Sequence, residues 1–94
     1  METMKLYIVK TYSILQGVTD DRDTRIIDYL DRDNEVLQPC LNQHVTLFPS
    51  YKDAQAYLGM ASRLVWDSLK QTERVINSII IEVQSVDVTE DLEA

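Results

Sequence analysis

The apolar residues between positions 50 and 71 recur every three or four residues, and this spacing constrains the fold more than any other feature of the chain. The apolar positions are Ala54, Tyr57, Leu58, Ala61, Leu64, Val65 and Leu69. Such spacing places these side chains on one face of an α-helix. Ser50, with Asp53 three residues later, is typical of a helix N-terminus. We therefore predict one amphipathic helix that begins after Ser50, continues through Gly59 and ends between Gln71 and Ile76.

Extended segments flank this helix in the sequence. Aromatic and β-branched residues, with alternation of polar and apolar positions, predict strands over residues 5–15, 24–30, 35–38 and 79–88. Residues 31–34 have the composition of a turn, so the second and third strands form a hairpin that ends at Pro39. Residues 44–48 are a further short extended piece, and Asn77–Ser78 are a connection. Residues 79–81 are apolar on both faces, which favours a central position in the sheet for the last strand.

These elements predict the fold class. The 94 residues are enough for one domain, 1–94, and the acidic tail 89–94 is expected to fray. The order strand-strand-strand-helix-strand indicates an α+β fold, a small antiparallel sheet with one amphipathic helix packed on one face. Trp66, beside Val65, is expected to close the rim of the core, and the alternative is an exposed binding anchor.

No set of residues in the chain has the pattern of a catalytic or metal site. Asp31 and Asp33 alternate as in a calcium loop, but Val36 stands where that loop needs glycine, so a solvated turn is expected. Cys40 and His44 are four apart without further ligands or a glycine-rich turn, and Cys40 is expected to be at least half-buried. We expect no enzyme, no metal and no cofactor, with a small ligand-binding domain or enzyme around Cys40 and His44 as the third alternative.

The net charge of the chain limits its partners. It is −7, from 16 acidic and 9 basic residues. Direct binding to nucleic acid or to an anionic membrane needs clustered Lys and Arg, so neither is expected, whereas a basic protein is a compatible partner. With a single cysteine and no apolar run of signal-peptide or membrane-spanning length, the expected location is the cytoplasm, or the host cell cytoplasm if the chain is phage-encoded.

The acidic residues concentrate in the segment 20–35 and in the last strand and tail. If these segments lie on the same side of the sheet, they form one negative surface that attracts a basic partner. Ordinary solvated loops are the equally weighted alternative. The residues predicted to bind the partner are Asp20, Asp21, Asp23, Asp31, Asp33, Glu35, Glu82 and Asp87.

These features favour a non-enzymatic protein-interaction module. In size and charge alone the chain resembles the small acidic anti-restriction and anti-CRISPR proteins of phages and mobile elements. That resemblance implies an inhibitor whose acidic surface mimics nucleic acid and binds a basic, nucleic-acid-handling protein or complex. The main alternative is a small homodimeric structural or accessory protein, joined through a sheet edge or the uncovered sheet face.

Overall fold

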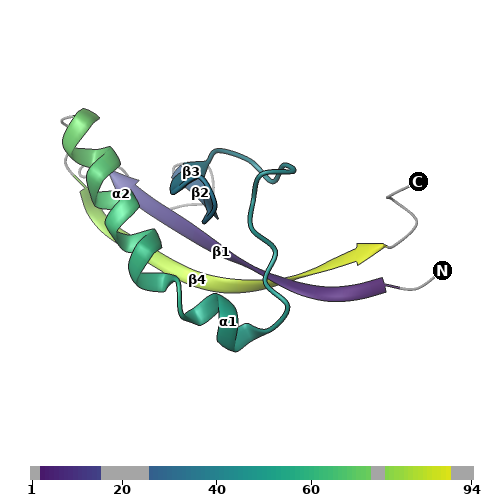
Figure 1. Ribbon diagram of the computed structural model, residues 1–94. Coiled ribbons are helices and arrows are strands. Elements are labelled where there is room, and N and C mark those ends of the chain that lie inside the picture. Colours follow the sequence, from purple (N-terminus) through teal and green to yellow (C-terminus); the bar gives the residue numbers. More distant parts are fainter. Residues whose placement is uncertain (1–2, 16–25, 73–75, 90–94) are drawn as a thin grey trace.

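The computed structural model describes residues 3–15, 26–72 and 76–89. It has a four-stranded antiparallel sheet in the order β3-β2-β1-β4, with the helices against one face (Figure 1). The elements in chain order are β1 (Thr3–Leu15), β2 (Ile26–Asp31), β3 (Val36–Gln38), α1 (Tyr51–Gln55), α2 (Leu58–Thr72) and β4 (Ile76–Thr89). The predicted α+β class and its element order are confirmed.

Strands β1 and β4 form a long antiparallel ribbon (Figure 1). Their pairing runs from Thr3 opposite Thr89 to Leu15 opposite Ile76, with an irregularity at 14–15. Two predictions are wrong here. Residues 77–78 belong to β4 and are not a connection, because Ser78 pairs with Ile14 and the strand continues to Ile76, opposite Leu15. The central strand is β1, and β4 lies at the edge of the sheet although its sequence is apolar on both faces.

The predicted hairpin is confirmed, but its turn is not simply solvated. Asp31 is fully buried, and its carboxylate accepts hydrogen bonds from the Asn34 backbone N–H (3.2 Å), Asn34 Nδ2 (2.8 Å) and Gln38 Nε2 (3.0 Å). These bonds hold the pKa of the Asp31 carboxyl below its ordinary value, chiefly through the Asn34 side chain. Glu35 completes the turn in the left-handed region, with φ of 53°.

The predicted helix is present but is divided in two. Ser50 caps α1 as expected, since its Oγ accepts the Asp53 N–H at 3.1 Å. The interruption lies at 56–57 and not at Gly59. There the Tyr57 N–H bonds to the Ala54 carbonyl, three residues back, and the Tyr57 ring packs on Phe48 with ring centroids 5.2 Å apart. Contact with Phe48 thus accompanies the change of helix direction.

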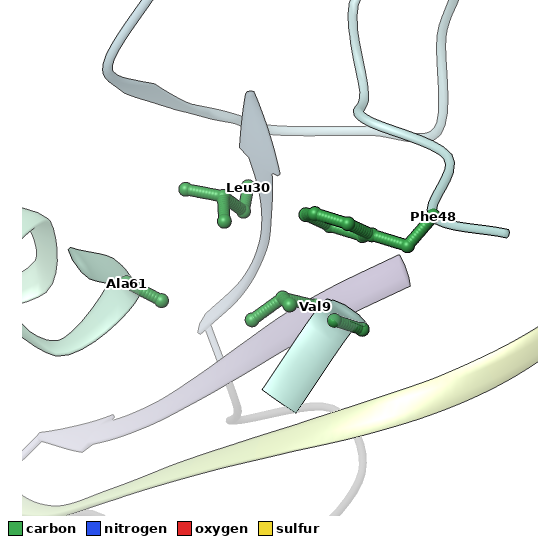
Figure 2. Close-up of a cluster of buried hydrophobic side chains, with 5 residues drawn as sticks. Val9, Leu30, Phe48 and Ala61 are labelled. Atoms are coloured by element: carbon green, nitrogen blue, oxygen red, sulfur yellow. The ribbon is translucent and has the colours of Figure 1, made fainter. Parts of the chain in front are cut away.

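The core lies between the helices and one face of the sheet. Val9, Leu30, Phe48 and Ala61 converge there from four segments of the chain, together with Ala54 (Figure 2). Phe48 comes from the segment between β3 and α1 and pairs with Tyr7 of β1 through two backbone hydrogen bonds of 3.0 and 2.8 Å. Of the extended piece predicted at 44–48, only Phe48 pairs as a strand residue does, and residues 44–45 lie in a turn. The Phe48 side chain fills the core beside the sheet.

Candidate protein-binding edge

The predicted acidic residues near the hairpin do not form an open group in the structure. Asp20, Asp21 and Asp23 lie outside the described residues. Asp31 is buried in the turn and is not available to a partner. Asp33 is exposed and pairs with Arg32 Nε at 3.2 Å, while Glu35 pairs with Arg63 at 3.3 Å. Two of these carboxylates therefore remain at the surface, each beside an arginine.

The remaining predicted residues, Glu82 and Asp87, lie on the other edge of the sheet. Both are exposed on β4, whereas the hairpin turn is on the β3 side. Side chains an odd number of residues apart on a strand point to opposite faces, so these two carboxylates do not share a face. Glu82 accepts a hydrogen bond from the Tyr12 hydroxyl at 2.7 Å on the face away from the helices. The described acidic residues are therefore divided between two edges and two faces.

Cys40 and His44 lie on the segment that follows β3. Cys40 is exposed, so the expectation that it is at least half-buried is wrong. Asn42 lies between the pair: its Nδ2 is 3.8 Å from Cys40 Sγ, and its Oδ1 accepts the His44 backbone N–H at 2.9 Å. Within residues 26–72 no hydrogen bond joins the thiol to the imidazole. The pair thus lacks the contact by which an imidazole activates a thiol.

A small cavity lies under α2, between β1 and β2. Its volume is about 90 Å³, and Ser13, Asp28 and Val65 are among its lining residues. Pockets for small organic ligands are usually roughly 300–1,000 Å³, so this cavity is of solvent size. Burial raises the pKa of Asp28. Thr11 and Ser13 are buried on the same side, which makes the sheet surface beneath α2 partly polar.

A shallow groove separates α2 from the β3 edge. Its volume is about 490 Å³, and its walls include Leu37 of β3 and Leu64 of α2. The ion pair between Glu35 and Arg63 crosses from the hairpin to the helix at this groove. Arg63 also approaches Asp67 at 4.0 Å. Charged side chains that already satisfy one another line its rim, so the groove presents little unpaired charge to a ligand.

The outer edge of β4 is the most open hydrogen-bonding surface of the described chain. The strand spans Ile76–Thr89, and no described residue pairs with its side away from β1. On an edge strand, every second residue directs its backbone N–H and C=O outward. Proteins usually protect such an edge with charged side chains, especially Lys, with Pro or with a short strand, and the charged residues of β4 are Glu82 and Asp87. β4 has 14 residues and contains no Lys, Arg or Pro.

The opposite edge of the sheet is short, and the chain itself closes part of it. β3 has only 3 residues and is followed by Pro39, which lacks a backbone donor. Beyond the end of β2, segment 46–48 makes the backbone hydrogen bonds on this side of the sheet. The Thr46 N–H donates to the Leu30 carbonyl at 3.0 Å, and Thr46 Oγ1 accepts the Arg32 N–H at 2.8 Å. The two edges therefore differ in the number of backbone groups that they offer to another chain.

Two exposed apolar side chains accompany the β4 edge. Ile80 of β4 is 43% exposed on the face away from the helices. Trp66 of α2 is 53% exposed, so the prediction that it closes the rim of the core is wrong. Leu64 and Ser68 of α2 border the groove beside β3. With about 100° of helix rotation per residue, Trp66 lies on the opposite flank, toward β4.

Comparisons with known proteins give no family for this chain. No protein-family profile, no curated protein and no solved structure matches it. Neither α1 nor α2 has the length and apolar character needed to cross a membrane. Among the described residues, no three His, Cys, Asp or Glu side chains are grouped so that they could hold a metal ion. The open edge of β4 is therefore the feature from which a function can be argued.

Proposed function

We propose that this protein is a non-enzymatic interaction module that binds an extended protein segment along the outer edge of β4. The observation that carries this proposal is the 14-residue edge strand without Lys, Arg or Pro. In β-strand addition, main-chain hydrogen bonds supply affinity and alternate side chains supply specificity. Ile80 and Trp66 are placed to contribute apolar contacts on the two faces next to that edge.

The acidic surface predicted from the sequence is a different way in which such a module could recognise a partner. It would need several carboxylates on one face, and the described ones are divided between the β3 and β4 sides. Its remaining support lies in the loop carboxylates at positions 20, 21 and 23, outside the described residues. We therefore assign recognition to backbone pairing at β4, with charge as a secondary influence on the choice of partner.

The test compares two exposed residues on opposite edges. Ile80 of β4 and Val36 of β3 are both 43% exposed and lie on strands at opposite edges of the sheet. Peptides are first selected from a random display library against the wild-type protein. Their binding sites are then mapped by amide NMR shifts. We expect shifts along β4, and we expect Ile80→Lys to weaken binding roughly 2- to 5-fold, from loss of one cross-strand pair.

Val36→Lys is the matched control, because it makes the same change at an equally exposed position on the other edge. It should leave peptide affinity unchanged. Shifts that map to the groove between β3 and α2, or equal losses in the two variants, would contradict binding at β4.

A further inference from the structure

The first half of β4 has the composition of a strand inside a sheet. Ile79, Ile80 and Ile81 are apolar on both faces, a pattern typical of strands inside a sheet. Within one chain, however, β1 is the strand's only described neighbour. An edge reserved for a foreign segment needs protection against other copies of its own chain, and β4 has no Lys, Arg or Pro. Its two charged residues, Glu82 and Asp87, oppose self-pairing only in registers where they directly face another acidic residue. Both observations favour a second strand beside β4, contributed by another copy of the chain.

Symmetry restricts how two β4 strands can pair. An antiparallel pair of identical strands is related by a two-fold axis perpendicular to the sheet. The axis keeps both helix layers on the same face, and directly opposite residues must also share a face. The axis therefore lies where one residue of β4 directly faces its own copy, and not midway between two successive residues. Only axes at Glu82 and at Val83 keep nearly the whole of Ile76–Thr89 paired.

Charge decides between these two registers. An axis at Glu82 places that carboxylate directly opposite its own copy, which is destabilising. An axis at Val83 places Glu82 opposite Gln84 of the second copy, and Ile80 opposite Val86. In the second register no acidic residue of β4 directly faces another one.

Resting on the proposed function, we infer that the extended segment bound by β4 is β4 of a second copy, paired antiparallel about Val83. The two four-stranded sheets then form one continuous sheet, with α1 and α2 of both copies on the same face. The pairing gives β4 the second neighbour that its sequence indicates.

The experiment first changes Gln84 alone on the full chain, and its control then exchanges the side chains at positions 82 and 84. Gln84→Glu places like charges opposite each other at two symmetry-related pairs. Lys10 Nζ, which lies 3.2 Å from Gln84 Oε1, can still donate to the new carboxylate, so the single copy remains folded. Sedimentation equilibrium should show a wild-type dimer whose dissociation constant rises roughly 2- to 30-fold in this variant.

The matched control is the double variant Glu82→Gln with Gln84→Glu. It has the same net charge as the wild type and restores an amide opposite every carboxylate, so its dissociation constant should return to within about twofold of the wild-type value. Glu82→Gln alone should change the constant little. If the exchange instead tightens the dimer beyond the wild-type value, the axis lies at Glu82 and the proposed register is wrong, because the exchange then removes the repulsion between the two copies of Glu82.

Salt separates this dimer from a complex with a basic partner. Each copy has a net charge of −7, so screening should tighten the dimer as salt rises, whereas it loosens pairing between opposite charges. A wild-type protein that stays monomeric at about 0.5 mM, or a dimer insensitive to Gln84→Glu, overturns the inference. If selected peptides still map to β4 in that case, the proposed function stands and only the identity of the bound strand is wrong.

Discussion

The β3 edge and the β4 edge belong to the same sheet but end it in different ways. On the β3 side, a 3-residue strand followed by Pro39 offers few outward backbone groups, and segment 46–48 bonds to Leu30 and Tyr7. On the β4 side, a strand of 14 residues extends along the whole of β1 without a described outer neighbour. Local chain connections can close one edge of a small sheet. The other edge then keeps its outward backbone groups without a partner among the described residues.

The largest expected effect is on the closed side, at Phe48. Phe48→Ala removes a ring that is 1% exposed in the core and that carries the backbone pairing with Tyr7. We expect the free energy of unfolding to fall by about 3–5 kcal/mol. Leu47→Ala, at an exposed neighbour, should change it by less than about 0.5 kcal/mol in the same urea titration. Similar losses in both variants would show that segment 46–48 does not close this side through Phe48.

The stability of the protein depends on pH through Asp31, in the hairpin turn on the β3 side. Its pKa in the folded state lies below the ordinary value of 3.8, because Asn34 and Gln38 donate to the ionised carboxylate. Its contribution to stability is therefore present above about pH 4 and is lost as pH falls through the lowered pKa. Asp31→Asn should reduce stability at pH 7 and flatten the acid limb of the stability curve. An unchanged acid limb would show that other carboxyls govern acid unfolding.

Trp66 tests the open side. Trp66→Ala should weaken self-association roughly tenfold if the ring is a central anchor beside β4. Leu41→Ala is the comparison, since Leu41 is 54% exposed in the segment after β3. It should leave association unchanged, as measured by sedimentation equilibrium. An equal effect at Leu41 would remove the distinction between the two sides.

The smallest effect is expected at Asp28, in the cavity between the sheet and α2. Burial raises its pKa in the folded state, so folding is disfavoured as pH rises through that raised value. Asp28→Asn should therefore stabilise the protein modestly at pH 7, with the gain disappearing at low pH. Thermal unfolding at pH 3 and pH 7 measures the difference. A loss of stability at pH 7 would mean that the carboxylate makes a favourable contact there.

Local pattern was enough to predict the helix, its Ser50 cap and the hairpin, because each depends on neighbours in the sequence. It failed for Trp66, whose neighbour Val65 is buried while the indole lies on the outer flank of the same helix. The sequence prediction was also wrong for Asp31, because the groups that donate hydrogen bonds to its carboxylate can be identified only in the folded structure. The predicted acidic group failed to converge among the described residues because the sheet order separates the hairpin from β4.

The sequence by itself determined the α+β class, the apolar helix face and the apolar character of residues 79–81 on both faces of β4. These properties follow from the periodicity of side chains, which is local. Only the tertiary structure decided that β1 is central and β4 is at the edge. Strand order depends on which distant segments pair, and the pairing of β1 with both β2 and β4 is invisible to local periodicity. A strand whose composition suits the interior of a sheet was thereby placed where another chain can reach it.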